Sequence, residues 1–437
     1  MGITEALQLS DANSVLLAKG KEKRGMSKTR RPWKLFSALL ILSMLLVACG
    51  GGGQPTPAQE TQAPAASGGG EGGTILIGAA LCLTGIQAPL DEPALRGAQL
   101  AVEEINKKGG VLGKKLELVN LDGKSDPVTV GNVAVQLIEQ GAKAIITPSD
   151  FDFGGPAARE AQKAGIVAIS PAASSPLFGS KTLGDKQFTM SMWNTTMGAI
   201  GAEFAYTKKG WRTTYVVTDT FIDYTKSLSR YFIQAFKDLG GEVFFEDTYT
   251  QGAQDFSAQL ARIQALPKQP DFIYISSYMP DLGTIIRTIR EAGIKTPIMG
   301  GDSYDDPGLF QAVGADYGND IFFTTHSWVS PDTSPEMKAF LDAWNAKYGS
   351  KPDAMWVVTG WDVVNILAQA MEKAGTTDGA AVAKAMENTE WNLLTGKLKW
   401  SDAASGHETD KEGAIVELQK AQPSFLGWVR PAHIPPP

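Results

Sequence analysis

Cysteine and histidine are scarce in this 437-residue sequence, which contains two Cys and three His. The histidines, His326, His407 and His433, are far apart, and none has a partner at a metal-ligand spacing. No G-x-S-x-G elbow, Walker A loop or clean G-x-G-x-x-G fingerprint occurs either. The sequence therefore gives no pattern for nucleophilic, metal-dependent or nucleotide-dependent chemistry. We expect neither an enzyme nor a bound metal or cofactor.

Long apolar runs are also missing. The longest, residues 35–47, has 13 residues, whereas a membrane-spanning helix needs about 20. A basic segment, residues 28–34, precedes this run, and Cys49 follows shortly after it. This order is typical of a cleaved signal peptide rather than an uncleaved anchor. Met26 is a more plausible start of such a signal than Met1.

The run Leu46-Val47-Ala48-Cys49 resembles the lipobox of bacterial lipoproteins. The resemblance implies that residues 1–48 are a removable signal region and that Cys49 carries a lipid. Residues 49–73 are rich in Gly, Pro and Ala, so after the lipidated cysteine we expect a flexible linker. Cys82 is then unpaired, and we interpret it as a small buried side chain in a fold without an internal disulfide.

Negative charge dominates the rest of the chain. Residues 1–48 contain eight Lys/Arg and three Asp/Glu, a net charge of +5, while the whole chain has −7. Residues 49–437 therefore have a net charge of −12. An acidic domain argues against nucleic acid and an anionic lipid surface as partners.

Short β-branched runs alternate with segments of helical period from residue 74 almost to the end. The expected strands are 74–78, 115–122, 144–147, 166–170, 213–218, 242–248, 272–276 and 298–300, with short ones near 396–400, 414–420 and 426–430. The expected helices include 94–106, 127–140, 197–208, 226–239, 281–292, 336–348 and 358–373. Strands separated by helices form parallel sheets covered on both faces. There are too many for one sheet, so we predict an α/β fold with two doubly wound lobes and a disordered tail, 431–437.

Several motifs then occur in a characteristic order. They lie at 78–85, 96–113, 122–127, 169–176, 255–257, 271–278 and 299–302, and include the runs NKKGGVLG, SPAASSP and MGGD. Over residues 74–428 the chain resembles the branched-chain amino acid type of periplasmic binding proteins, the solute receptors of ABC importers. The resemblance implies a type I clamshell with three crossovers. One lobe would contain 74–193 and 326–395, and the other 194–325 and 396–430.

The resemblance also implies how an amino acid would be held. The loop of Ala172, Ala173 and Ser174 would bind the carboxylate through backbone N–H groups and a hydroxyl, although a capped turn is an alternative interpretation. Asp302 would bind the ammonium group; alternatively it caps a helix. Tyr278 would reach the ligand from the second lobe, unless it only packs.

The sequence departs from the family in the pocket. Phe151 stands where a serine often binds the carboxylate, and Ser149 can replace that serine only if the loop shifts by two residues. Leu90 stands where an aromatic side chain is common. Further aromatic candidates for the pocket are Phe153, Trp193, Phe221 and Tyr224. They favour an aromatic or bulky ligand as much as leucine, but each is also consistent with core packing.

These observations predict an extracytoplasmic receptor that binds an amino acid or a similar small carboxylate and delivers it to the permease subunits of an ABC importer. We expect a monomer, lipid-anchored at the outer face of the cytoplasmic membrane, in the periplasm or at the cell surface. A ligand-sensing protein for an amide or an aromatic acid is the alternative. A secreted hydrolase would need a catalytic cluster that the sequence lacks.

Overall fold

The computed structural model describes residues 73–253, 255–352 and 354–437. The expected signal region, Cys49 and the linker up to residue 72 lie outside the described residues. Within the described part, none of the helices combines the length and the apolar character that crossing a membrane requires.

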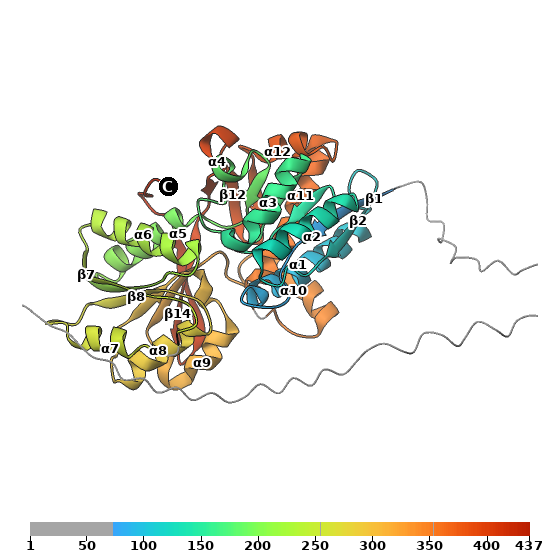
Figure 1. The fold of residues 1–437 in the computed structure, drawn as a ribbon. Coiled ribbons are helices and arrows are strands. Elements are labelled where there is room, and N and C mark those ends of the chain that lie inside the picture. Colours follow the sequence, from blue (N-terminus) through green and yellow to red (C-terminus); the bar gives the residue numbers. More distant parts are fainter. Residues whose placement is uncertain (1–72, 254, 353) are drawn as a thin grey trace, which may run out of the picture. The chain divides into compact units, whose positions relative to one another are not determined.

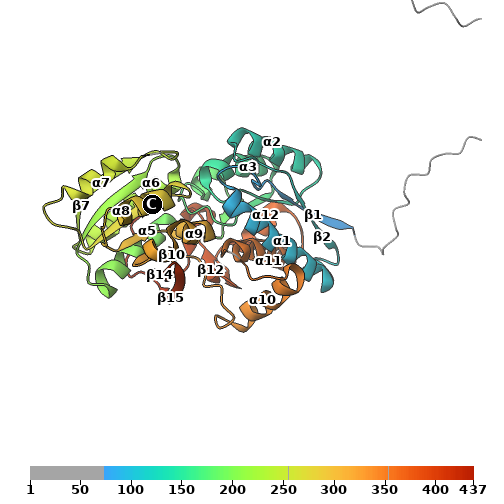
Figure 2. The ribbon, with the colours of Figure 1, turned by 90° about the horizontal axis from the view of Figure 1, so that it is seen from below.

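In the described residues the first lobe is built on a five-stranded parallel sheet of order β2-β1-β3-β4-β5. Its strands are β1 (Thr74–Ala79), β2 (Lys115–Asn120), β3 (Ala144–Ile146), β4 (Val167–Ser170) and β5 (Gln187–Thr189). The helices on one face are α1 (Ala88–Lys107), α11 (Trp356–Ala374) and α12 (Gly379–Met386), and those on the other are α2 (Pro127–Glu139) and α3 (Phe151–Ala164). Figure 2 shows these two layers on either side of β1 and β2.

Glycines allow α1 and α11 to pack backbone to backbone. A Cβ atom at Gly97 would lie 1.9 Å from the carbonyl oxygen of Val357, and one at Gly360 would lie 1.9 Å from that of Ala94. No larger side chain fits at such a distance. Both helices begin earlier than their patterns predicted, at Ala88 instead of 94 and at Trp356 instead of 358.

The second lobe contains, in the described residues, a seven-stranded sheet of order β15-β14-β10-β9-β8-β6-β7. Its strands are β6 (Thr213–Asp219), β7 (Glu242–Tyr249), β8 (Phe272–Ser276), β9 (Ile298–Gly300), β10 (Ile321–Thr325), β14 (Gly413–Gln419) and β15 (Gln422–Val429). The first five are parallel to one another, whereas β14 and β15 are antiparallel to their neighbours.

Helices cover both faces of this second sheet. On one face lie α5 (Asn194–Glu203) and α6 (Asp223–Asp238), and on the other α7 (Ser257–Gln264), α8 (Asp281–Glu291) and α9 (Pro307–Tyr317). Figure 1 shows both layers. The short helix α4 (Ser180–Leu183) and the longer α10 (Pro335–Tyr348) belong to the first lobe.

The described chain passes between the lobes three times, after β5, after β10 and before β14. The crossovers contact one another. Ser191 Oγ in the first lies 3.1 Å from His326 Nε2 in the second, and the Trp193 N–H donates to Thr409 Oγ1 near the third at 3.2 Å. Two doubly wound α/β lobes joined by three crossovers confirm the predicted fold class.

A small antiparallel sheet of β11 (Glu390–Leu393), β12 (Gly396–Trp400) and β13 (Thr409–Asp410) packs on the first lobe. Trp400 Nε1 donates to the carbonyl of Thr189 at 2.8 Å, and its ring meets Phe188 edge to face at 5.2 Å. Residues 396–410, which we expected in the second lobe, therefore contact the first sheet. The chain joins the second sheet only at β14.

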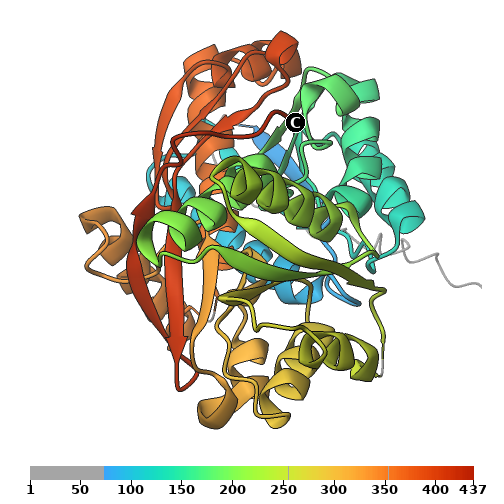
Figure 3. The same ribbon diagram turned by 90° about the vertical axis from the view of Figure 1, so that its left-hand side faces the viewer.

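The C-terminal residues follow β15 at the edge of the second sheet (Figure 3). Residues 431–437, expected to be disordered, contain no helix or strand. They are nevertheless held in place: the N–H of Ala432 donates to Glu203 Oε2 at 2.7 Å, and Pro431 and Pro435 are buried.

Candidate functional site

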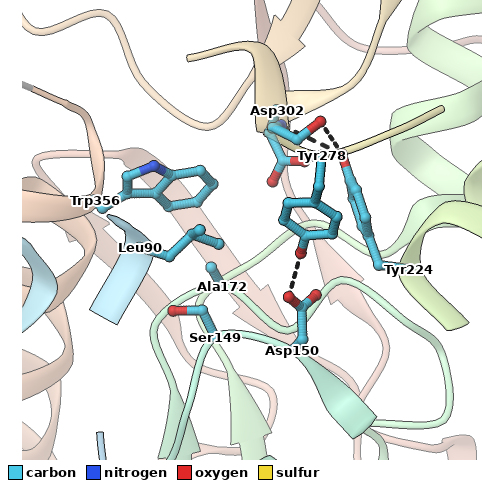
Figure 4. Close-up of a pocket in the computed structure, with 9 residues that line it drawn as sticks. Leu90, Ser149, Asp150, Ala172, Tyr224, Tyr278, Asp302 and Trp356 are labelled. Atoms are coloured by element: carbon cyan, nitrogen blue, oxygen red, sulfur yellow. Dashed lines mark hydrogen bonds between the residues drawn. The ribbon is translucent and has the colours of Figure 1, made fainter. Parts of the chain in front are cut away.

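A small cavity lies between the two lobes. The nine side chains that line it are Leu90, Ser149, Asp150, Ala172 and Trp356 from the first lobe and Tyr224, Tyr278, Asp302 and Ser303 from the second (Figure 4). Several of them follow the carboxyl ends of strands, where ligands bind in parallel α/β sheets. The cavity volume is about 10 Å³, which is room for about one water molecule. A larger solute therefore requires the lobes to move apart.

Asp302 is one of the two acids that line the cavity. It follows β9, and only 3% of it is exposed. Its Oδ1 accepts a hydrogen bond from the Tyr224 hydroxyl at 2.6 Å, and its Oδ2 lies 2.7 Å from His326 Nε2. A Cβ at Gly301 would lie 2.6 Å from the Tyr224 hydroxyl oxygen, so glycine at this position lets Tyr224 approach Asp302. Burial and the Asp302 charge raise the pKa of Tyr224 well above its usual value.

Asp150 places a second carboxylate in the cavity. Its Oδ2 accepts hydrogen bonds from Gln87 Nε2 at 2.8 Å and from the Tyr278 hydroxyl. Burial raises the pKa of Asp150 to about 7, although these two hydrogen bonds oppose the shift. Asp150 belongs to the first lobe and Tyr278 to the second, so their hydrogen bond joins the lobes across the cavity (Figure 4).

Ser149 lines the cavity, but its N–H and hydroxyl groups are hydrogen-bonded to a third acid, Asp91. Its N–H and its hydroxyl both donate to Asp91 Oδ1, at 3.0 and 2.6 Å. Asp91 Oδ2 accepts the N–H of Cys82 at 2.9 Å. Burial raises the pKa of Asp91 to about 7, and that of the Cys82 thiol is raised by the same cause. Cys82 is thus a small buried side chain, as the sequence predicted, and Asp91 holds the loops after β1 and β3 against α1.

The loop expected to bind a carboxylate is hydrogen-bonded internally. The N–H groups of Ala172 and Ala173 donate to Ser170 Oγ at 3.3 and 2.9 Å. Of the three predicted residues, only Ala172 lines the cavity. The hydroxyl of Ser174 is buried, with no hydrogen-bond partner among the described residues. Ser170 thus caps this turn, and the role of the loop in binding a carboxylate stays a prediction.

Three aromatic candidates lie away from the cavity. Phe151 is half-buried at the start of α3, with the Arg159 guanidinium over its ring at 5.9 Å. Phe221 is 47% exposed. Trp193 is buried beside a separate space of about 300 Å³, which Arg230 also lines.

Phe153, also considered from the sequence, is a buried core residue. Trp356 and Asp150 do line the cavity, yet the sequence did not single them out. Trp356 lies in the first turn of α11, upstream of the residue where the helical pattern begins. Asp150 lies in the loop between Ser149 and Phe151, which were both considered.

Ser191, His326 and Asp302 have the residue types of a hydrolase triad but not its geometry. In such a triad the acid and the serine contact different ring nitrogens of the histidine. Here both lie against Nε2, at 2.7 and 3.1 Å, while Nδ1 has no partner among the described residues. The hydroxyl of Ser191 is buried and donates to the carbonyl of Met192 at 2.7 Å. Ser191 and His326 instead connect Asp302 to the first and second crossovers.

The comparison with known families agrees with this arrangement. Residues 74–423 match the family model described as periplasmic binding protein. The chain belongs to this family. The resemblance predicted from the sequence is thereby confirmed.

Two curated relatives illustrate the family. The Leucine-, isoleucine-, valine-, threonine-, and alanine-binding protein of Pseudomonas aeruginosa is 27% identical over 330 residues, covering 75% of this chain and 86% of the relative. The Leu/Ile/Val-binding protein of Escherichia coli is 27% identical over 328 residues, covering 75% and 87%.

Solved structures show the same fold. The isoleucine complex of LivJ from Streptococcus pneumoniae is 27% identical, with a TM-score of 0.73, and covers 81% of this chain and 98% of that one. The leucine-binding protein LivK from Thermotoga maritima is 28% identical, with a TM-score of 0.74, over 82% and 99%. A benzoate complex from R. palustris, described as an ABC transporter solute-binding protein, is 25% identical, with a TM-score of 0.71, over 83% and 98%.

Proposed function

We propose that this protein is the solute receptor of an ABC importer and that it binds an amino acid or a related small solute between its lobes. The observation that carries the proposal is Asp302, buried between Tyr224 and His326 in the interlobe cavity. Asp302 occupies the position to which the family resemblance assigns the ammonium group, and Tyr278 that of a cleft tyrosine from the second lobe. Relatives that bind leucine, isoleucine or benzoate support a small solute of this size.

The binding energy follows from the contacts available. A charge-assisted hydrogen bond contributes about 1.5–3 kcal/mol, and burying a side chain of leucine size contributes about 2–3 kcal/mol. Four or five such contacts, minus the cost of association and closure, give micromolar affinity or tighter. Because the cavity is lined from both lobes, a solute that touches Asp150 on one lobe and Asp302 on the other favours the closed arrangement.

The tether and the partners are part of the same proposal. Lipid on Cys49 would hold the receptor at the outer face of the cytoplasmic membrane, and the linker to residue 73 would keep it within reach of the permease subunits. The basis is the run Leu46-Val47-Ala48-Cys49 after a short apolar segment. Labelling cells with a radioactive fatty acid should label the wild type but not Cys49→Ser. Equal labelling of both would contradict lipidation at Cys49.

A receptor role without catalysis is the conclusion we favour. The Ser191, His326 and Asp302 group lacks the geometry for acyl transfer, and the solute is expected to leave the cleft unchanged. Mass spectrometry of solutes incubated with the purified protein tests this. A product formed with turnover would contradict it.

A thermal-shift screen tests the main proposal. Residues 74–437 should first be unfolded and refolded, which removes any solute that co-purifies. A solute present at 100 times its dissociation constant stabilises the folded state by about 2.7 kcal/mol, so a binder shifts the thermal midpoint by several degrees. The screen should include amino acids, amino acid amides, amines and aromatic acids. A refolded protein that responds to none of them would overturn the proposal.

A further inference from the structure

The hydroxyl groups that line the interlobe cavity all donate to protein acceptors. The Tyr278 hydroxyl donates to Asp150 and the Tyr224 hydroxyl to Asp302. The Ser149 hydroxyl donates to Asp91, and that of Ser303 to the carbonyl of Ser277 at 2.8 Å. A hydroxyl has one proton and two lone pairs. The Ser149, Tyr224 and Ser303 bonds lie within one lobe, so these side chains have only lone pairs left to offer a solute, whereas the Tyr278–Asp150 bond joins the two lobes and breaks when they move apart.

The two carboxylates of the cavity have acceptor capacity as well. Asp150 and Asp302 both line it and are almost completely buried, and an ionised carboxylate has about four lone-pair positions. None of the nine side chains that line this cavity in the described structure is Lys, Arg or His. The nearby N–H groups of Ala172 and Ala173 already donate to Ser170 Oγ. The lining thus has acceptors and no basic side chain, while His326 Nε2 contacts Asp302 Oδ2 at 2.7 Å from outside the lining. Because burial raises the pKa of Asp150 to about 7, a cation beside it favours the charged form of this acid.

Aromatic side chains form other parts of the wall. The Tyr224 and Tyr278 rings lie with their centroids 5.2 Å apart, and Trp356 lines the cavity beside Leu90 (Figure 4). The faces of tyrosine and tryptophan rings attract cations, more strongly where water is excluded. The faces of these rings have partial negative charge and do not stabilise a buried carboxylate.

We infer that the solute of this receptor carries a net positive charge, with one N–H donor group for Asp302 and a second for Asp150. This inference rests on the proposed function and narrows its ligand class. The matching solutes are amino-acid-like cations: an amino acid amide, whose carboxyl end donates N–H, or an amino acid with a cationic side chain. A neutral aliphatic amino acid or an aromatic acid has no second donor group for Asp150, whereas a cationic side chain supplies one even though the α-carboxylate remains.

Two matched pairs of probes test the inference by isothermal titration calorimetry on refolded residues 74–437. L-leucinamide differs from L-leucine only at the carboxyl end, and L-lysine differs from L-norleucine by a terminal ammonium group. We expect the cationic member of at least one pair to bind at least tenfold more tightly. If the neutral member binds equally or more tightly in both pairs, the inference is overturned while the receptor function stands. If none of the four probes binds, the proposed amino acid function fails too.

Variants test whether Asp150 gives the cavity its preference for the cationic probe. Asp150→Asn removes one charge from the cavity and should reduce the advantage of the cationic probe at least tenfold. Asp152→Asn is the matched control, because Asp152 lies two residues on, is not among the lining residues and accepts the N–H of Asp223 at 2.9 Å. This control variant should change the affinity advantage of the cationic probe by less than threefold. An undiminished advantage in Asp150→Asn would refute the assignment to Asp150. The wild-type ratios test the charge of the solute even if a variant does not fold.

Discussion

Replacing Asp302 by asparagine removes a charge from the interlobe cavity and preserves the shape of the side chain. The carboxylate has two protein contacts, the Tyr224 hydroxyl at 2.6 Å and His326 Nε2 at 2.7 Å. An amide oxygen still accepts from Tyr224. The amide N–H₂ faces His326 Nε2, which can accept once the ring proton moves to Nδ1, a nitrogen without a partner among the described residues. We therefore expect the variant to fold.

The expected loss of affinity comes from one interaction. A hydrogen bond between an ammonium group and a buried carboxylate contributes about 1.5–3 kcal/mol. Since 1.4 kcal/mol corresponds to a factor of ten, Asp302→Asn should weaken binding of an amine-bearing solute by about 10- to 150-fold. The loss should be largest for solutes without a carboxylate, such as an amino acid amide, because they have no negative group that gains from the change.

Calorimetry of the wild type and the variant with the same solute measures this loss. Asp305→Asn is the control, since Asp305 is a half-buried residue three positions on that accepts from Thr325 Oγ1 at 2.8 Å and does not line the cavity. The solute affinity of the Asp305→Asn protein should stay within threefold of the wild-type value. An Asp302→Asn protein with an unchanged thermal midpoint and an affinity also within threefold would refute the role of Asp302 as the ammonium partner.

Three further changes test other parts of the molecule. Trp356→Ala should weaken solute binding about tenfold by removing an aromatic wall; a change below twofold in the same titration would exclude Trp356 from the binding surface. Trp400→Ala should lower the free energy of unfolding by about 3–5 kcal/mol, because its ring is fully buried and donates to Thr189; urea denaturation measures this, and a loss under 1 kcal/mol would count against the packing described. Burial raises the pKa of Asp305 to about 7, so the folded state holds this proton more tightly than the unfolded chain, and stability falls as the pH rises from about 4 to 7. Asp305→Asn should therefore raise the thermal midpoint more at pH 8 than at pH 5, and equal shifts at the two values would contradict this.

Much of the lobe architecture was predictable because central strands such as β3, β4 and β8 are short, mostly apolar runs that are buried on both faces. The same logic predicted part of the cavity. Tyr278, Asp302 and Ser149 follow the ends of β8, β9 and β3, and side chains at that edge of a parallel sheet point toward the ligand crevice. The family resemblance then assigned roles to the first two, and these roles stay predictions until binding is measured.

Other residues of the site depend on contacts that periodicity does not contain. Trp356 precedes the residue at which the α11 pattern begins, so its place in the cavity follows from where α11 meets α1. The hydrogen bonds of Asp150 come from Gln87 and Tyr278, 63 and 128 residues away in sequence. Apolar patterning also gave no reason to separate Trp193, which borders a different space, from residues of the cavity.

The boundary at residue 396 shows a similar limit. A short hairpin buries one face, and its pattern does not say which sheet receives that face. Trp400 places the hairpin on the first sheet, because its ring contacts Phe188 and its Nε1 donates to the carbonyl of Thr189. Both partners lie more than 200 residues earlier in the chain.

The core of the first lobe joins residues that the ribosome makes at very different times. Ile75 in β1 and Trp400 in β12 belong to one buried cluster, about 325 residues apart in synthesis. Until α11 and β12 have been made, one face of the first sheet and the apolar face of α1 lack the partners that offset the entropy of ordering the chain. The N-terminal segment thus cannot complete its lobe while the remainder is being translated.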